Sequence, residues 1–428
     1  MTLSALDPNQ NRARLAWMIV WGSFALFLSL CISVPLLANA YVQRATIPLP
    51  LRLPPAKARW PLAKPTMAEW LPLPLEAAPL EVRAGAEILT NAADTASLLI
   101  AEPAEGRVLV RGQIYGHTNL QVEEASTPRF RWSTAEPQLT LDMRSGRIRL
   151  TLLPHVTGAL PVTIKTPQGI ITLTEAGQYS LEVNNETAQV AVQEGSARLA
   201  VETESESIPL FLTADQRGLI PTGGLPEGPL GTERNLIRNG NFIADLSGWI
   251  QQDWNIELAD EPTETAVIAA SNGTALRFAR VGIGHADAVV RQNLNQDVTD
   301  YTSLRFLISL QIKVQTLGVC GTVGSECPLT VELDYVDRDG NRQVWRQGFY
   351  ATGTVATDTP DTCINCRPPY NPHIQLPANR LYVYEIDLID NLALQAFPPP
   401  RYLNSIRLIA AGHGFEVEVV DVALLARE

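Results

Sequence analysis

The chain has 428 residues, of which 46% are apolar and 18% are charged, a balance typical of folded domains and not of disordered segments. This length exceeds what one ordinary core organises, so we expect two folded domains. A net charge of −12 argues against a nucleic-acid partner, because binding to phosphates needs clustered Lys and Arg.

The first predicted element is a membrane-spanning helix. Leu15 to Leu37 runs without a charge and is long enough to cross a hydrocarbon core of ~30 Å. We therefore expect a cytoplasmic tail at 1–14, a transmembrane helix at 15–37, and a single-pass cell-membrane protein whose bulk is extracytoplasmic. The alternative is secretion after cleavage at Ala40, because Ala38-Asn39-Ala40 has the small-x-small pattern of a cleavage site.

A proline-rich segment follows the helix. Prolines recur every few residues from Pro48 to Pro79. Proline fixes φ and removes a backbone donor, which disfavours helix and central strand. The pattern predicts an extended stalk over 38–80, rising ~3.1 Å per residue.

The next region alternates apolar and polar residues with period two. Leu139-Thr-Leu-Asp-Met143 and Ile148-Arg-Leu-Thr-Leu152 are examples, and Ser145-Gly146 between them is typical of a turn. We expect an antiparallel β domain over 81–220. A linker rich in glycine and proline follows at 221–235.

Alternation resumes in the last region. Every second residue from Leu304 to Val314 is apolar, and Phe415-Glu-Val-Glu-Val419 repeats the pattern near the end of the sequence. About eight such strands predict a two-sheet β-sandwich of the jelly-roll kind over 236–428. The predicted fold class is therefore all-β, preceded by one transmembrane helix.

Residues 85–220 resemble the FecR domain, a periplasmic β domain of bacterial envelope sensors. The resemblance rests on the order and spacing of several motifs: Gly85-Ala-Glu-Ile-Leu-Thr-Asn91, Thr95-Ala-Ser-Leu-Leu-Ile100, Leu139-x-Leu-x-Met-x-Ser-Gly-Arg147, Thr166-Pro-Gln-Gly-Ile-Ile171, Glu175-Ala-Gly-Gln-Tyr-Ser-Leu-Glu-Val183, Val190-Ala-Val-Gln-Glu-Gly195 and Leu212-Thr-Ala-Asp-Gln216. It implies a sensing or scaffolding module. FecR regulators carry a sizeable cytoplasmic region that contacts a sigma factor, whereas only about 14 residues precede this helix, too few for a folded domain.

The last domain resembles galactose-binding-like and carbohydrate-binding-module jelly rolls at both of its ends. Its opening, Asn235-Leu-Ile-Arg-Asn-Gly-Asn-Phe242, and its last strand, Glu418-Val-Val-Asp-Val-Ala-Leu424, carry the likeness. The resemblance implies a structural calcium, for which Asn241 and Asp421 are the candidate ligands. Ile243 stands where the family commonly has an acidic residue, so one of the oxygen ligands that calcium prefers is missing.

Four cysteines lie in loop-like inserts of the last domain, at Cys320, Cys327, Cys363 and Cys366. An even number of cysteines outside the cytoplasm predicts two disulfides, whose connectivity the spacing leaves open. The alternative is a zinc site made by all four thiolates.

The candidate ligand-binding residues are aromatic side chains that stack on sugars and polar groups beside them: Trp254, Trp345, Arg346, Tyr350 and Tyr370. The sequence contains no Gly-x-Ser-x-Gly, no His-Glu-x-x-His and no phosphate-binding glycine loop, so we expect a protein that is not an enzyme. Asp334 and Asp337 are an acidic pair beside a turn, which we interpret as a solvated rim and not as glycosidase carboxylates.

These observations predict an envelope protein that senses or binds a glycan, or an envelope protein, without covalent chemistry. The alternatives are a structural envelope scaffold without a small ligand and a FecR-type signal-transduction regulator. No cofactor is expected apart from the calcium or zinc named above.

Overall fold

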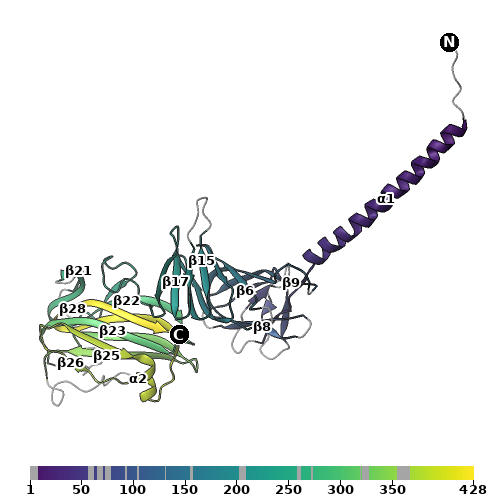
Figure 1. Cartoon of the computed structure of the whole chain (residues 1–428). Helices are drawn as coiled ribbons and strands as arrows, with labels where there is room; N and C mark the ends of the chain where they lie inside the picture. Colours follow the sequence, from purple (N-terminus) through teal and green to yellow (C-terminus); the bar gives the residue numbers. More distant parts are fainter. Residues whose placement is uncertain are drawn as a thin grey trace, which may run out of the picture. The chain divides into compact units, whose positions relative to one another are not determined.

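A computed structural model describes residues 8–55, 62–64, 71–72, 79–91, 94–103, 106–130, 132–154, 158–201, 209–257, 262–270, 273–318, 320, 327–353 and 367–428. It is mostly β with one long N-terminal helix, as predicted (Figure 1). The chain divides into two compact units, Met1–Pro229 and Leu230–Glu428, and the division falls within the segment 221–235.

The first unit contains one helix and a series of short and long strands. These are α1 (Pro8–Arg44), β1 (Thr46–Pro48), β2 (Leu51–Leu53), β3 (Leu62–Lys64), β4 (Leu71–Pro72), β5 (Leu80–Val82), β6 (Glu87–Leu89), β7 (Ala96–Ala101), β8 (Val108–Ile114), β9 (Asn119–Pro128), β10 (Gln138–Leu152), β11 (Val162–Lys165), β12 (Ile170–Leu173), β13 (Gly177–Val183), β14 (Thr187–Glu194), β15 (Ala197–Ala200), β16 (Leu210–Leu212) and β17 (Gln216–Pro221), with β18 (Glu227–Gly231) at the division between the units.

The helix α1 covers the predicted span 15–37 and extends beyond it at both ends. Its apolar side chains are exposed on all sides, from Trp17 at 63% to Leu37 at 68%. A helix that is apolar all round belongs in a bilayer or in a core, and no part of this apolar stretch is buried in the protein. Among the described residues, α1 is the one helix long and apolar enough to cross a membrane, a criterion that a signal sequence also meets.

The stalk prediction is wrong for residues 46–53, which belong to the first β unit. The strand β1 pairs with β9, and β2 pairs with both β5 and β7. Leu49, Leu51 and Leu53 are buried in the core of this unit. The carbonyl oxygen of the intervening Pro50 accepts a hydrogen bond from the Ala101 amide at 3.2 Å. The leucines between these prolines therefore belong to a strand that is paired on both sides, and not to a solvated spacer.

The strand β10 joins the two sheets of the first unit, whose pairings close into a barrel. Its first half pairs with β9 and β11, and its second half pairs with β8 and β13. The predicted turn at Ser145-Gly146 is therefore wrong, because these residues lie inside one continuous strand. Gly146 has a φ of +97°, and a Cβ there would lie 2.3 Å from the Thr118 Cα, so only glycine fits where the strand bends.

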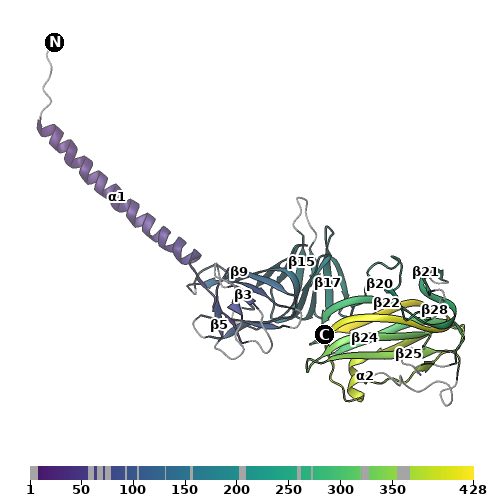
Figure 2. The same cartoon turned by 180° about the vertical axis from the view of Figure 1, so that it is seen from behind.

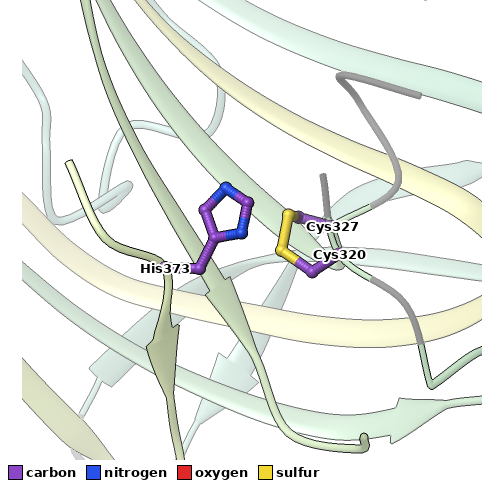
Figure 3. Close-up of side chains that lie close together, drawn as sticks. All are labelled: Cys320, Cys327 and His373. Carbon is purple, nitrogen blue, oxygen red and sulfur yellow. A yellow bond between two sulfur atoms is a disulfide. The ribbon is translucent and has the colours of Figure 1, made fainter. Parts of the chain in front are cut away.

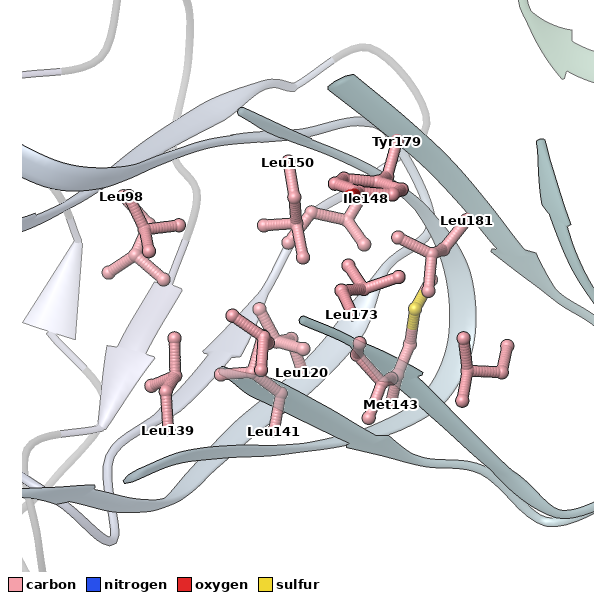
Figure 4. Close-up of a cluster of buried hydrophobic side chains, with 14 of the residues drawn as sticks. Leu98, Leu120, Leu139, Leu141, Met143, Ile148, Leu150, Leu173, Tyr179 and Leu181 are labelled. Atoms are coloured by element: carbon pink, nitrogen blue, oxygen red, sulfur yellow. The ribbon is translucent and has the colours of Figure 1, made fainter. Parts of the chain in front are cut away.

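The core of the first unit lies between these sheets. Figure 4 shows Leu120, Leu141 and Met143 pointing towards Leu150 and Tyr179 from strands on opposite sides. All of them are fully buried. They come from alternate positions of their strands, which is the period-two pattern that the sequence displays.

The second unit is a β-sandwich with one short helix. Its elements are β19 (Arg234–Asn235), β20 (Ile250–Trp254), β21 (Glu264–Ala270), β22 (Gly273–Asp297), β23 (Ser303–Gln315), β24 (Leu329–Asp337), β25 (Arg342–Tyr350), β26 (Ile374–Gln375), β27 (Tyr382–Asp387), α2 (Leu388–Leu394) and β28 (Pro400–Arg427). The long alternating strand predicted from Leu304 to Val314 is β23.

The long strands β22 and β28 run through both layers of the sandwich and lie side by side (Figure 1, Figure 2). In one layer the order is β20-β22-β28-β24-β25-β26. In the other, β22 pairs with β21, and β28 pairs with β23, which also pairs with β27. The register of β22 against β28 shifts between Val281 and Ala286, where glycines on both strands allow the bend.

Candidate functional site

The candidate site is the outer face of the layer β20-β22-β28-β24-β25-β26, which we call the outer face. In β22, Ala288 and Val290 are fully buried in the sandwich core. Because side chains alternate along a strand, Asp287, Val289 and Arg291 point to the opposite side of the layer. In β28, β24 and β25, the residues that pair directly with these positions of β22, or with each other in turn, lie on the same face.

Four charged residues form a row across the outer face. Arg291 in β22 lies opposite Arg407 in β28, Arg407 lies opposite Glu332 in β24, and Glu332 lies opposite Arg346 in β25. Directly opposite residues in an antiparallel sheet have neighbouring side chains on one face. The register therefore brings together three arginines and one glutamate from strands far apart in the sequence.

Glu332 connects two of the arginines. Its Oε1 accepts from Arg346 Nε at 2.5 Å, and its Oε2 pairs with Arg407 Nη2 at 2.8 Å. The side chains of Arg346 and Arg407 keep 24% and 31% of their surface exposed, whereas that of Glu332 keeps 11%. The carboxylate thus holds both guanidinium groups in place and leaves them partly open to water.

Arg291 differs from its neighbours in the row. Its side chain forms no hydrogen bond or ion pair with the residues that the structure describes, and its Nε is buried without an acceptor. The Nε of Arg407, directly opposite, also lacks one. Buried donors are normally paired, so two unpaired Nε–H groups at one place in the row are unusual. Because these Nε atoms are closed to solvent, an acceptor from outside the chain would bind the partly exposed parts of the two side chains.

Trp254 lies on the same face, at the end of the edge strand β20 and opposite Asp287. Its ring is 53% exposed. Asp287 is fixed by Asn255, which donates to it at 2.7 Å, and by His285 Nε2 at 2.9 Å. Asp287 and Arg291 are four positions apart along β22, about 13 Å at the usual rise of a strand. Val289 lies between these two positions and is itself buried.

Two of the aromatic candidates named in the sequence analysis do not lie at a surface. Trp345 is buried between the sheets, where its ring centroid lies 5.7 Å from that of Phe306 and its Nε1 donates to Asn391 Oδ1 at 2.9 Å. Tyr350 is buried against the disulfide described below. Both predictions of ligand contact are wrong, because these two large aromatic side chains are buried and not exposed at a surface.

The other candidates remain accessible but do not share one place. Arg346 belongs to the charged row. Tyr370 is 45% exposed, and its backbone N–H donates to Gln395 Oε1 at 2.9 Å, in the segment that precedes β26. The structure therefore brings together Trp254 and Arg346 on the outer face. Arg291, Arg407 and Glu332 were missed, because only the strand register shows that they are neighbours.

One of the two proposed calcium ligands, Asn241, makes other contacts in the described part of the chain. The Asn241 carbonyl oxygen accepts from Thr274 Oγ1 at 2.7 Å, and its Oδ1 accepts from the Ile243 amide at 3.4 Å. Asp421 is exposed in β28, where it lies opposite Ser309. Calcium binding at Asn241 and Asp421 stays a prediction.

Cys320 and Cys327 form a disulfide, one of the pairings that the sequence leaves open. The ring of His373 lies beside it (Figure 3), with ligand atoms of all three residues within 4.8 Å of one another. A Cβ added to Gly348 of β25 would lie 2.8 Å from His373 and 3.2 Å from Cys327 Sγ, so the disulfide packs against the outer face one row from Arg346. Cys363 and Cys366 lie outside the described residues, and the zinc alternative stays a prediction.

The acidic pair beside the turn is held by structural hydrogen bonds. Asp337 Oδ1 accepts from the amides of Asp339 at 3.0 Å and Asn341 at 2.8 Å, and it is fully buried, so it is not the solvated rim that we predicted. Asp334 pairs with Arg342 and accepts from Asn404 at 3.0 Å. Burial favours a higher pKa for each carboxyl group, but these hydrogen bonds outweigh it and hold both pKa values below the ordinary range.

No family model matches this chain, and no curated protein matches it. The FecR resemblance therefore stays a prediction. Solved structures that match part of this chain include a family 11 carbohydrate-binding module from Clostridium thermocellum in complex with a β-1,3-1,4-mixed-linked tetrasaccharide. It is 12% identical, with a TM-score of 0.26, over 46% of this chain and 96% of the module.

Two further structures are similar to parts of the chain. One is described as an anti-sigma factor from Parabacteroides distasonis, 15% identical with a TM-score of 0.25, over 38% of this chain and 66% of that protein. The other is the enzymatically active domain of tailspike protein 4 from Bacteriophage CBA120, 11% identical with a TM-score of 0.29 over 45% of this chain. This chain spans only 21% of that tailspike structure.

Proposed function

We propose that this is a membrane-anchored, non-catalytic binding protein of the bacterial envelope that holds a carboxylate-bearing glycan on its outer face. The observation that supports this most is the pair Arg291 and Arg407, two partly exposed arginines directly opposite each other, of which Arg291 has no acceptor in the described part of the chain. A sugar polymer offers both the acceptors and the flat apolar ring faces that this surface calls for.

The charged row is suited to carboxylates. Its three arginines and one glutamate carry two more positive than negative charges, within a chain whose net charge is −12. Guanidinium groups bind carboxylates through two parallel hydrogen bonds, which are stronger than those between neutral groups. Glu332 orients Arg346 and Arg407 before a ligand arrives, so less side-chain entropy is lost on binding.

Trp254 supplies the apolar half of the interaction. An exposed indole stacks on the C–H face of a sugar ring, while nearby polar groups fix its orientation. The separation of about 13 Å between the Trp254 position and the arginine row, at the rise of a strand, fits a ligand longer than one ring. The outer face is therefore better suited to a polymer than to a monosaccharide.

The acidic chain limits what else this surface binds. Long-range repulsion from the net charge of −12 disfavours polyanions in general, so a carboxylated ligand must gain its affinity from short-range contacts with the arginine row. Contacts of this kind weaken with salt when they are partly exposed. We expect binding that weakens, but persists, at physiological ionic strength.

The test measures glycan binding by the full-length chain in detergent micelles. Immobilised polygalacturonate and hyaluronan are compared with a neutral mixed-linkage β-glucan, for the wild type, for Arg291→Gln and for Trp254→Ala. A hydrogen bond to a charged group contributes about 1.5–3 kcal/mol, so Arg291→Gln should weaken binding of the acidic polymers about 10- to 100-fold. Arg198→Gln removes the same charge from an exposed position in the first unit and serves as the matched control.

Three outcomes contradict the proposal in different ways. If Arg198→Gln weakens binding as much as Arg291→Gln does, the effect comes from the net charge and not from the outer face. Binding to the neutral glucan alone would support a glycan ligand but contradict the requirement for a carboxylate. An absence of binding to all three polymers, with protein partners captured by crosslinking in intact cells, would favour a structural scaffold.

A further inference from the structure

A short aromatic loop is hydrogen-bonded to the end of the long helix. We define it as residues 129, 130 and 132–134, between β9 and β10. Gln43 in the last turn of α1 accepts from the Thr134 amide at 2.6 Å through its Oε1 and from Ser133 Oγ at 2.9 Å through its carbonyl oxygen. The Arg129 amide donates to Ala45 at 2.9 Å, and Arg129 Nη1 donates to Tyr41 Oη at 3.3 Å. These contacts fix the loop at one end of α1.

The loop carries an apolar surface with a cation beside it. Phe130 and Trp132 stack with ring centroids 6.0 Å apart, and Tyr41 of α1 meets Phe130 edge-on at 6.1 Å. The Arg129 guanidinium carbon lies 5.9 Å from the centre of the Phe130 ring. Trp132 is nevertheless 71% exposed, although it is the largest apolar side chain of the loop.

Helix length places this loop at a definite depth. The uncharged stretch of α1 is bounded by Arg14 and Arg44. Thirty residues at the α-helical rise correspond to about 45 Å, close to the thickness of a bilayer with both headgroup layers. If Arg14 lies at one surface, the last turn of α1, with Tyr41 and Gln43, lies in the opposite headgroup layer.

We infer that the aromatic loop is a second membrane contact, in which Trp132 and Phe130 insert among the lipid headgroups next to the helix. This inference rests on the membrane anchor of the proposed function but not on glycan binding. Amphipathic aromatic rings favour this layer, where one side is apolar and the other is wet. Arg129 completes the contact, because its guanidinium group lies beside the rings and pairs with lipid phosphate.

The contact gives the first unit a fixed attachment to the bilayer. Residues 46–53 are strands and not a stalk, so little chain separates the helix from the first unit. The hydrogen bonds to Gln43 and the insertion of the loop then act together. Insertion of Trp132 removes apolar surface from water without any rearrangement of the backbone.

The test uses the full-length chain reconstituted in vesicles of phosphatidylcholine and phosphatidylglycerol. A photoreactive benzoylphenylalanine replaces Trp132, Phe211 or Trp17 in separate variants. Phe211 is the matched control, because it is a 66% exposed aromatic residue of the same unit, in β16, where it lies opposite Arg198. Trp17 lies within the apolar stretch of α1 and reports whether the helix is in lipid.

After illumination, mass spectrometry should find phospholipid adducts at positions 17 and 132 and none at 211. Adducts at 17 without adducts at 132 would overturn the inference while the anchor stands. A lack of adducts at 17 would remove the anchor and the inference together, and adducts at all three positions would show unspecific contact and also overturn it. Unchanged hydrogen exchange in β9 and β10 verifies that each variant is folded.

Discussion

Replacing Trp345 by Phe distinguishes a core residue from a ligand contact. The indole of Trp345 lies between the sheets, beside Phe306, and its Nε1 donates to Asn391 Oδ1. Phe keeps most of the apolar ring but lacks the N–H donor. The variant therefore removes one buried hydrogen bond and leaves a small cavity in the second unit, while the outer face keeps all of its side chains.

The expected cost follows from these two losses. A buried hydrogen bond contributes about 1 kcal/mol, and a cavity of at least methyl size costs about 1 kcal/mol more. A total of about 2 kcal/mol raises the population of the opened second unit about 30-fold. Trp345→Ala would cost about 3–5 kcal/mol, which threatens the fold itself.

Hydrogen exchange measured by mass spectrometry on the full-length chain in detergent reads the two units separately. Trp345→Phe should speed exchange of protected amides in β24, β25 and β28, while peptides of the first unit act as the internal control. Glycan binding by the folded variant should match that of the wild type. Unchanged exchange together with lost binding would refute the reasoning and return Trp345 to the ligand-binding surface.

Three further outcomes are expected. Gly146→Ala should destabilise the first unit by more than about 1 kcal/mol, because positive φ and the contact with Thr118 both oppose a Cβ; faster exchange in β10 would report it, and unchanged exchange would contradict it. The pKa of Asp337 is lowered by folding, so the ionised carboxylate stabilises the folded state above its unfolded pKa of about 3.9. This stabilisation is lost as the pH falls through the folded pKa. Asp337→Asn should therefore reduce the loss of stability in acid, measured by hydrogen exchange from pH 2 to 7. Changing Cys320 and Cys327 together to Ser should cost about 2–3 kcal/mol in the second unit and weaken glycan binding at the adjacent outer face, whereas unchanged binding would show that the disulfide does not support that face.

The sequence pattern predicts the fold well where burial follows a simple period. The uncharged run from Leu15 predicts the helix, and alternation predicts β23 and the two halves of β10. The prediction fails where the same residue pattern occurs in two different structures. Leucines between prolines look like a stalk, yet Leu51 and Leu53 fill the core because the carbonyl groups of the prolines still pair.

The candidate site is harder to predict because it depends on pairing between distant strands. Arg291 and Arg407 are ordinary outward residues when each strand is considered alone, and the register makes them neighbours. The aromatic residues show the opposite problem. Trp254 and Trp345 look alike in the sequence, because each lies in a strand. Only the strand pairing shows that Trp254 is at an exposed edge and that Trp345 is between two sheets.

The sharing of β28 between the two layers has a consequence for biogenesis. Its residues 402–427 pair with residues of β22, β23 and β24 that lie roughly 65 to 145 positions earlier in the sequence. Nascent β22 and β23 must therefore wait, without their central neighbour, until β28 emerges. Such delayed closure makes folding slow and leaves apolar strands exposed in the meantime. We expect this half of the protein to depend on a holding chaperone until β28 has been synthesised.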